Sequence, residues 1–505
     1  MRNNGRTTDY ACKKNGKVTK TSVWRANNKK WVKKKTDSYL TGSITVFLSL
    51  MLAFVLAAVF SLLEGARVWG LEKRVSTDAV QTGHSLMAEY TPSLWKDYHV
   101  LFLDGSYEKD MFSIANVEER GILFSAENLD VFSGITGEVQ AETWNLFGIH
   151  PQTLELETYE LATDHDGQSF RMQAAASVKA EVGMDLLKSI YKYLTKSDEE
   201  PKVTAPAVVE ETEQRPEIAE NPVDTIARIR ENGLLGIVYR NQAVSEKKMD
   251  LSQTIGKREL REGTWQREEA SEDWAAQILF LEYLVKKFSD CRGRTDGNTL
   301  DYELEYLVAG KGSDRENLQS VINQLTLMRE VVNFVYLQSD QEKQELALAV
   351  ATVIGTATLS PEMIPALKQG ILAAWAYAES LSDVRLLLDG QKVSLMKTQD
   401  QWHTDLLHLE SSISGTEKQE EGLDYEQYLR ILMWKTRETV LTQRAMDLIE
   451  AKEQIRMDEQ ITAFQGKMNY TGEPLFSTFV TIGKGHPGTY IFQKEVQGDY
   501  LEDIR

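Results

Sequence analysis

Cysteine is scarce in this chain: Cys12 and Cys291 are its two cysteines among 505 residues, and neither belongs to a metal-binding motif. Small exported domains often depend on several disulfides, which two such distant cysteines cannot supply. We therefore expect hydrophobic cores to stabilise the folded part of the chain. The content of 42% apolar and 26% charged residues is typical of a globular protein, not of a disordered one.

Signatures of catalysis are missing as well: the chain has no H-E-x-x-H, G-x-S-x-G or G-x-x-x-x-G-K-S/T motif. Ala309–Ser313 is rich in glycine, but its spacing does not fit a phosphate loop, and a turn before a helix explains it. His403 and His408 are five residues apart and would not share a helix face. Asp164–Gly167 could orient an imidazole or bind a cation, but it also has the composition of an ordinary turn. We therefore expect a protein that is not an enzyme, and we assign no catalytic, cofactor-binding or metal-binding residue.

One long uncharged stretch is present. Ile44–Leu63 has twenty residues without a charge, and a helix of that length spans about 30 Å, the thickness of the hydrocarbon core of a bilayer. Residues 1–42 hold twelve Lys and Arg against Asp9 and Asp37, a net charge of +10; the whole chain carries −19, so the rest carries −29. Positive charge beside a first apolar segment keeps that end in the cytoplasm. The sequence therefore predicts a single-pass membrane protein with a cytoplasmic N-terminus and most of the chain extracytoplasmic.

Three other interpretations of this region stay open. A cleaved secretory signal usually has an apolar core of about 7–15 residues and a small-x-small cleavage site, whereas this run is longer and continues into Glu64. A buried core helix would rarely contain twenty uninterrupted apolar or small residues. The basic tail could be a nucleic-acid arm, but its aromatic residues, Trp24 and Trp31, are sparse. The expected partner of the tail is the anionic inner leaflet, and we expect no nucleic acid.

Two charged residues mark the outer end of the predicted span. Glu64 and Arg67 are one helical turn apart and could pair, although capping and anchoring the helix is the simpler role. Helical spacing of apolar residues continues through 67–98, which predicts a stalk. Gly65, Gly70 and Gly83 should each weaken that stalk by about 1 kcal/mol relative to alanine.

The fold class predicted from the sequence is mainly α with minor β (α+β), with one N-terminal transmembrane helix that continues into a stalk. Residues 197–222 hold four prolines and eight acidic residues without an aromatic residue, which is typical of a linker. The chain then divides into a basic tail or leader (1–42), a transmembrane helix (43–66), a membrane-proximal α+β region (67–196), the acidic Pro-rich linker (197–222), a mainly helical ectodomain (223–465) and a C-terminal β-hairpin region (466–505).

Individual helices follow from caps and apolar spacing. Ser313 with Glu316 three residues later predicts a helix start. The ranges 346–359 and 370–388 predict core helices, and 425–456 reads as one long amphipathic helix. The tetrapeptide Leu-Asp-Tyr-Glu occurs at 300–303 and at 423–426, and both copies predict a helix start with the aspartate as N-cap.

Strands are fewer. The range 153–163 alternates apolar and polar residues, as in a half-buried strand. Near the end of the chain, an alternating run over 476–482, a glycine-rich turn over 483–488 and a second run over 489–494 predict a β-hairpin.

The residues around the start of the span resemble those of a known class. Thr41-Gly42-Ser43-Ile44-Thr45-Val46-Phe47 follows a Lys-rich leader, and it resembles the G-S-x-T-V start of the apolar helix in TadE-like and other type IV pilin-like proteins. The resemblance implies cleavage by a prepilin peptidase between Gly42 and Ser43, and packing of the helix into a pilus or its assembly machine. The pilin pattern has glutamate five residues after the cut, where this chain has Phe47. A plain signal anchor with a coincidental glycine is the alternative.

Longer blocks are similar to a bacterial family of unknown function, whose members are single-span proteins encoded beside Tad-type pilus genes. The blocks are GSITVFLSLML with LLEGARV, LMAEYTPSLWKDYHVLFLD, NPVDTIARIRENGLLGIV, LDYELEYLVAGKGSDRENL and ILAAWAYAESLSDVRLLLDGQKVSL. The likeness covers most of residues 40–465. It implies a shared domain architecture and a link to pilus or secretion assembly, and it supplies no catalytic residues.

Three functions follow as hypotheses. The first is a structural or assembly protein of the bacterial cell membrane, pseudopilin-like at its membrane end, with pilus or secretion assembly proteins as partners. The second is a membrane-anchored cell-surface or cell-wall hydrolase, which rests only on location and on the many carboxylates. The third is an extracytoplasmic sensor that acts through a partner, since a tail of about forty residues is too short for an ordinary output domain.

Overall fold

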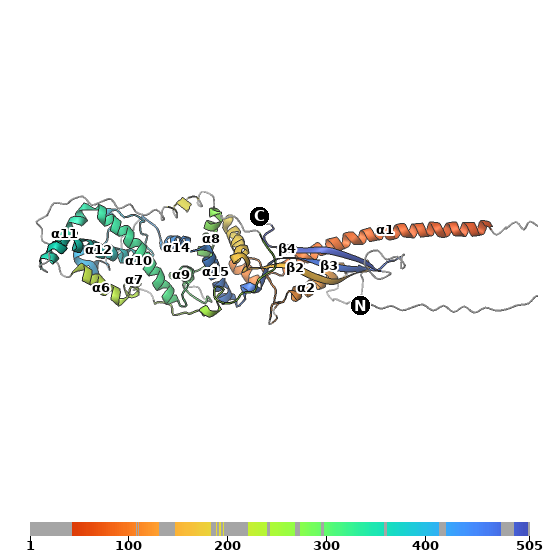
Figure 1. The fold of residues 1–505 in the computed structure, drawn as a ribbon, viewed down its shortest axis with the longest axis horizontal. Helices are drawn as coiled ribbons and strands as arrows, with labels where there is room; N and C mark the ends of the chain where they lie inside the picture. The colour runs from red at the N-terminus through yellow and green to blue at the C-terminus, as the bar shows by residue number, and fades with distance from the viewer. Residues whose placement is uncertain are drawn as a thin grey trace, which may run out of the picture. The chain divides into compact units, whose positions relative to one another are not determined.

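The computed structural model describes residues 43–107, 109, 111–130, 147–182, 188, 191–192, 195, 221–239, 243–267, 273–293, 297–357, 361–413, 421–475 and 489–502. The chain forms two compact units, Met1–Leu62 and Leu63–Arg505. The second unit is mainly helical with a small antiparallel sheet, which confirms the predicted fold class (Figure 1).

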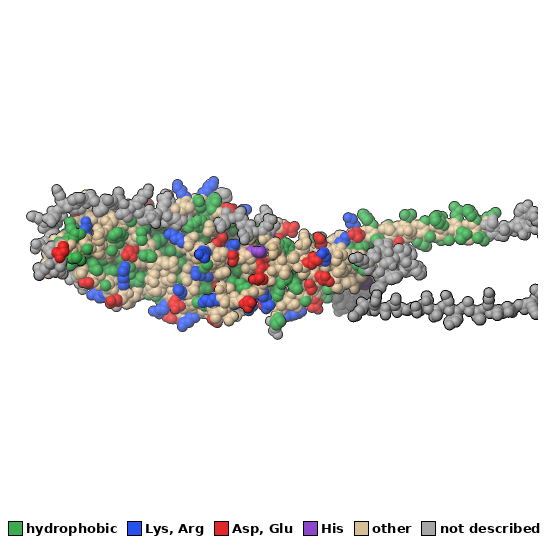
Figure 2. Space-filling view, viewed as in Figure 1, with side chains coloured by type: hydrophobic (Ala, Val, Ile, Leu, Met, Phe, Trp, Pro, Cys, Tyr) green, Lys and Arg blue, Asp and Glu red, His purple; other side chains and the backbone are tan. Residues whose placement is uncertain are grey.

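Helix α1 spans Ser43–Ala88. The side chains of Ile44–Leu63 are exposed, and Figure 2 shows this part of the helix as an apolar surface without acidic or basic groups. Within the described residues this is the one helix that is long and apolar enough to cross a membrane, with a mean hydropathy of 2.8 in its most apolar window. Its length and composition fit a single span or a signal sequence. The predicted stalk is shorter than expected: α1 ends at Ala88, before Pro92, and a short π-helical turn, Leu94–Tyr98, follows.

The sheet is built around β3. Strand β3 (Gln460–Gly472) pairs antiparallel with β2 (Ile149–Leu161) on one side, and with β1 (Leu103–Asp104) and β4 (Tyr490–Asp499) on the other. Strands β3 and β4 thus form a C-terminal hairpin. It begins at 460, inside the region predicted to be helical, and the predicted run 476–482 lies outside the described residues.

Glycine explains why this strand was missed. The inward positions of the second half of β3 are Phe464, Gly466, Met468, Tyr470 and Gly472, so glycine interrupts the apolar alternation. A Cβ at Gly466 would collide with the main chain of Glu155 on β2. The close approach of two strands demands glycine there, and it removes the pattern that predicts a strand.

The second part of α1 runs beside β4 in the same direction (Figure 1). From Glu64 to Met87 the helix rises about 34 Å, and from Tyr490 to Tyr500 a strand covers about the same length. Helix and strand therefore stay in step along the sheet. Four contacts along the two elements show this parallel course: Glu64 with Tyr490, Glu72 with Lys494, Gly83 with Gln497, and Met87 with Tyr500.

A hydrophobic core fills the space between α1, α2 (Ile114–Leu129) and the sheet. Leu71, Val75 and Ala79 follow a four-residue spacing on α1, so they share the face that packs on the sheet. Asp78 is buried beside this core, where it accepts hydrogen bonds from Ser125 and Tyr470; burial raises the pKa of this carboxyl.

A larger core, continuous through the helical region, holds the rest of the unit together. Its longest helices pack against one another, α10 against α12 and α11 against α12. The helices of this region are α4 (Gln168–Lys179), α6 (Pro222–Asn232), α7 (Leu235–Val238), α8 (Trp274–Lys287), α9 (Glu303–Ala309), α10 (Asp314–Ser339), α11 (Gln341–Ala357), α12 (Ile364–Leu388), α13 (Leu409–Ser412), α14 (Tyr425–Trp434) and α15 (Glu438–Glu453).

Two helix starts agree with the sequence analysis and one does not. Ser313 caps α10 and Asp424 caps α14, each by accepting a backbone N–H three residues later. Asp301 does not cap α9, whose N-cap position is Tyr302. The Asp301 carboxylate instead accepts a hydrogen bond from the ammonium of Lys247.

The long helix predicted over 425–456 is two helices. Helix α14 ends at Trp434, and Arg437 has an extended backbone before α15 begins at Glu438. No glycine or proline marks the break. It lets α14 pack against α8 and α9 while α15 packs against α9 and the turn at Asp164, which is a tertiary requirement.

The sheet joins regions that the sequence analysis treated as separate. Strand β2 belongs to the predicted membrane-proximal region, whereas β3 lies more than 230 residues beyond the predicted linker. Backbone pairing along β2 and β3 makes both parts members of one compact unit. Residues 197–220 lie outside the described residues.

Candidate functional site

The predicted boundary pair forms a junction where α1 enters the folded unit. Glu64 is only 4% exposed, and its Oε1 accepts a hydrogen bond of 2.7 Å from the Tyr490 hydroxyl and one of 3.3 Å from the Leu475 N–H. Arg67 Nη1 lies 3.4 Å from the same oxygen, so the ion pair considered from the sequence is present.

Arg67 connects two further segments to the helix. Its Nη1 donates to the Glu473 carbonyl oxygen at 2.6 Å, and its Nη2 donates to the Phe147 carbonyl oxygen at 2.7 Å. Glu64 and Arg67 together therefore join the first turn of α1 after the uncharged run to the end of β3, the start of β4 and the segment before β2. The sequence showed the pair but not these partners, which lie 80 to more than 400 residues away.

The predicted cleavage site is described only in part. Ser43 is the first residue of α1, and Gly42 lies outside the described residues.

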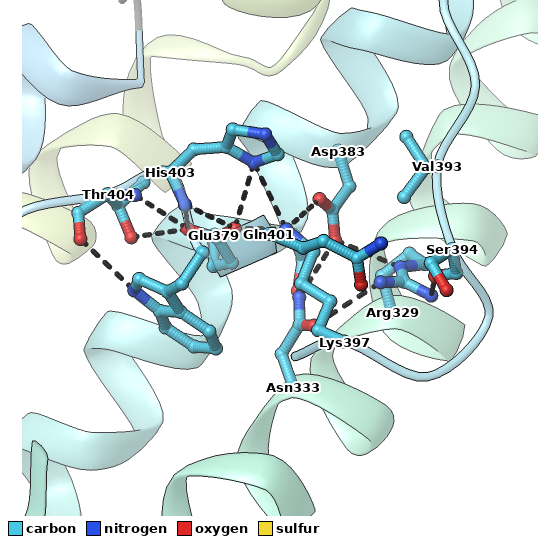
Figure 3. A network of polar contacts seen from close by, with 12 residues as sticks. Arg329, Asn333, Glu379, Asp383, Val393, Ser394, Lys397, Gln401, His403 and Thr404 are labelled. Carbon is cyan, nitrogen blue, oxygen red and sulfur yellow. Dashed lines mark hydrogen bonds and ion pairs between the residues drawn. The ribbon is translucent and has the colours of Figure 1, made fainter. Parts of the chain in front are cut away.

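A second polar centre is buried in the helical region (Figure 3). Its side chains come from α10, from α12 and from the irregular segment after α12: Arg329 and Asn333; Glu379 and Asp383; Lys397, His403 and Thr404. On each helix the two residues are four positions apart, so they project from one face. We call this set the buried ion cluster.

Lys397 lies at its centre, as Figure 3 shows. The Lys397 ammonium is ion-paired with Glu379 Oε1 and with Asp383 Oδ1, the latter at 2.6 Å, and it lies 3.2 Å from His403 Nδ1. The second oxygen of Glu379 accepts hydrogen bonds from the Thr404 N–H at 2.8 Å and the Thr404 hydroxyl at 2.7 Å. The lysine and both carboxylates have side-chain exposures of 0%.

Arg329 completes the cluster from α10. Its Nε donates to Asp383 Oδ2 at 2.9 Å, and its Nη1 donates to the carbonyl oxygens of Ser394 and Leu395, each at 2.9 Å. The guanidinium therefore binds α12 and the main chain of the irregular segment at the same time. The segment has little regular structure of its own, and these bonds fix its path.

The charges of the cluster balance. Two cations, Arg329 and Lys397, face two carboxylates, Glu379 and Asp383. Burial alone would raise the pKa of Glu379, but the Lys397 charge and the His403 contacts outweigh it and hold the pKa well below its usual range. Burial would lower the pKa of Lys397, and the two carboxylates raise it instead. Glu379, Lys397 and Arg329 are therefore charged at neutral pH.

Three residues of the cluster are of metal-binding type. Glu379, Asp383 and His403 each offer a ligand atom, and these atoms lie within 4.8 Å of one another. The ammonium of Lys397 contacts the same three residues, so a metal ion would have to displace it and would leave a buried lysine unpaired. The donor set thus fits a structural ion network better than a metal centre.

Two cavities in the described part of the chain lie elsewhere. One of about 290 Å³ is lined by polar residues that include Asp447, Glu450 and Arg258. The other, of about 380 Å³, is lined by Ser289 and Arg292 among others. No residue of the buried ion cluster lines either of these two cavities.

The remaining motifs from the sequence have structural roles. Asp164 accepts the N–H groups of Leu161 and Gly263, and His165 and Asp166 have positive φ values, so Asp164–Gly167 is a tight turn. In the glycine-rich segment, Gly310 ends α9 with φ +64° and Ser313 caps α10.

The sequence analysis missed the buried ion cluster. His403 was judged only by its distance from His408, and Lys397 lies in a segment without a pattern. A signal did exist: Glu379 and Asp383 stand on one face of α12, in a part of the helix that is mostly apolar. Buried carboxylates require cationic or hydrogen-bonding partners, so this spacing predicts a partner without naming it.

Comparison with known proteins places the helical region in a family. Neither the curated proteins nor the solved structures gave a match to this chain. The model of a family of unknown function, DUF5702, matches residues 212–472, just over half of the chain. The match contains the whole buried ion cluster and ends with β3. The chain therefore belongs to the family of unknown function DUF5702.

Proposed function

We propose that this chain is a membrane-anchored extracytoplasmic structural or assembly protein, pseudopilin-like at its membrane end. The continuity of α1 carries the proposal. The helix that holds the uncharged run Ile44–Leu63 continues to Ala88, and its second part forms one wall of the core of the sheet. One helix thus contains both the uncharged run and a wall of the core of the sheet, which suits a protein that holds or moves other components.

The junction at Glu64 and Arg67 supports this mechanical role. A flexible linker would separate a membrane anchor from its cargo domain, whereas here the first turn after the uncharged run is fixed to three chain segments. Most of these bonds involve a charged partner, which makes each one stronger than a neutral hydrogen bond.

The sequence supports the pseudopilin-like part. Gly42-Ser43 after a basic leader resembles the processing site of TadE-like and type IV pilin-like proteins, although Phe47 departs from their glutamate. On this proposal residues 1–42 are cytoplasmic, the basic tail contacts anionic lipids of the inner leaflet, and the partners are proteins of pilus or secretion assembly.

N-terminal sequencing of the native protein tests the proposal. A mature N-terminus at Ser43 supports processing by a prepilin peptidase, and any other N-terminus removes the pilin-like part and leaves a plain signal anchor. Gly42→Leu should retain the leader because the peptidase requires a small residue before the cut. Gly65→Ala changes an equally small residue beyond the run and should be processed as wild type.

The two other classes have no observation of their own among the described residues. A hydrolase needs carboxylates that a substrate can reach, and those of the buried ion cluster are inaccessible and paired. Release of soluble fragments from purified cell wall by the full chain would favour a hydrolase over our proposal. Co-purification of a cytoplasmic signalling protein with the basic tail would favour a sensor.

A further inference from the structure

Three large apolar side chains are exposed where α1 enters the folded unit. Trp69 is 69% exposed, Leu475 is 64% exposed and Phe147 is 40% exposed. They come from α1, from the end of β3 and from the segment before β2. Exposed apolar residues scattered singly need no explanation, but a group gathered from three segments indicates a contact surface. We call these three residues the apolar collar.

The hydrogen bonds of the junction hold the collar in place. Arg67 binds the carbonyl oxygen of Phe147 itself, and Glu64 binds the N–H of Leu475 itself. Both apolar residues are therefore fixed beside the first outer turn of α1. Trp69 follows two residues after Arg67 on the same helix.

The position of Trp69 matches the interfacial layer of a bilayer. It is six residues beyond Leu63, so its Cα lies about 9 Å past the end of the uncharged run. Side chains of a helix lean toward its N-terminus, which brings the indole back toward the run. The headgroup region on each side of the hydrocarbon core is about 5–8 Å thick, and tryptophan is enriched there.

The charges beside the collar do not oppose contact with lipid. Glu64 and Arg67 neutralise each other and are largely covered, with side-chain exposures of 5% and 20%. This pair thus keeps its charges against the protein, and the exposed acid beside the collar is Glu473, two residues before Leu475. This arrangement suits a lipid interface, where unpaired charges at depth would be costly.

We propose that the apolar collar is a lipid-contacting surface: Trp69, Phe147 and Leu475 enter the outer interfacial layer of the membrane that the uncharged run of α1 spans. The inference rests on the proposed membrane anchoring. It adds that the folded unit sits on the membrane surface and is oriented by it, instead of standing away from the membrane on a bare stalk. Lipid is favoured over a second protein chain because Phe147 and Leu475 are bound to the helix at Arg67 and Glu64, directly after the uncharged run.

Fluorescent labelling of the full chain tests the collar. Replacing Cys12 by serine leaves Cys291, which is buried, and new cysteines can then be introduced one at a time and labelled with an environment-sensitive dye. The labelled chains are reconstituted into vesicles of phosphatidylcholine and phosphatidylglycerol, with or without lipids brominated near the headgroup. Leu475→Cys and Phe147→Cys should show blue-shifted emission that brominated lipid quenches.

Matched controls separate lipid contact from mere apolarity. Leu327 on α10 is 63% exposed, almost the same as Leu475, and Leu327→Cys should give aqueous, unquenched emission. Phe54→Cys lies in the middle of the uncharged run, and quenching by lipid brominated near the ends of its acyl chains reports membrane insertion itself.

Each outcome decides between the two proposals. Aqueous emission from both collar positions, with quenching at Phe54→Cys, would overturn the collar and leave membrane anchoring intact. No quenching at Phe54→Cys would overturn the anchoring on which the collar depends. Blue-shifted emission at the collar that brominated lipid does not quench would also overturn it, because a second protein chain would then cover the surface.

Discussion

Replacing Lys397 by methionine removes the ammonium that lies between Glu379 and Asp383. Methionine has a similar length and no charge, so the change leaves the shape of the site nearly unaltered. The buried ion cluster would keep Arg329 as a cation against two carboxylates, and it would carry one uncompensated negative charge. All of these side chains have exposures of 0%, so water cannot take over the role of the lysine.

The expected cost follows from this charge count. Removing one partner of a buried ion pair typically destabilises a protein by about 3–5 kcal/mol, because the remaining charge is left buried. Total stabilities of domains are about 5–15 kcal/mol. Lys397→Met should therefore lower the free energy of unfolding by about a fifth or more of a typical value.

A second substitution separates charge from packing. In Lys397→Met/Asp383→Asn the cluster is neutral again, and the asparagine carbonyl can still accept from Arg329 Nε. The double variant should lose less stability than the sum of the two single variants, with a coupling energy of at least about 1 kcal/mol.

Urea unfolding of the full chain in detergent micelles, followed by tryptophan fluorescence, measures these differences. Trp375 and Trp402 both donate to Thr404, so they report on the cluster directly. The wild type should also lose stability as the pH falls below about 4.5, since the folded-state pKa of Glu379 lies below that ordinary value and its contribution disappears on protonation. In Lys397→Met this acid-side loss should shrink.

Two results would refute the reasoning. If Lys397→Met unfolds within about 0.5 kcal/mol of the wild type, the ammonium does not compensate the carboxylates. If the single costs add without coupling, the residues do not act as one cluster.

Other substitutions test other parts of the fold. Burial raises the pKa of Glu305 to about 7 from an ordinary 4.5, so the wild type should lose stability as the pH rises through this interval. Glu305→Gln keeps an acceptor for the Tyr425 hydroxyl and should be up to about 3 kcal/mol more stable than the wild type at pH 8. Urea unfolding across the pH range measures both effects. A wild type whose stability rises over that interval would contradict this sign. Gly83→Ala should destabilise the protein by about 1–3 kcal/mol, because the new Cβ would meet the backbone of β4. Gly70→Ala has open space around it and should stabilise α1 by up to about 1 kcal/mol. Thermal unfolding compares the two variants, and equal effects would contradict the packing of α1 on β4. Asp424→Ala should cost about 1 kcal/mol by removing the cap of α14, and an unchanged melting temperature would contradict it.

Local features of the chain could be predicted because their causes are local. Ile44–Leu63 contains twenty uncharged residues, so exposing it to water is unfavourable, and the structure leaves these side chains exposed. The caps at Ser313 and Asp424 depend on a side chain and a backbone N–H three residues away, and both were found from spacing alone. The pairing of Glu64 with Arg67 is of the same kind.

Tertiary structure alone decided what needed distant partners. Strand β3 was missed because Gly466 packs against a neighbouring strand about 310 residues away in sequence, and the break between α14 and α15 carries no breaker residue. The buried ion cluster and the junction at Glu64 likewise combine residues whose roles exist only once the chain is folded. Caps and apolar runs act within a few residues, so the sequence by itself determined them. The partners of buried charges are chosen by packing across the whole unit, and sequence spacing holds no record of that choice.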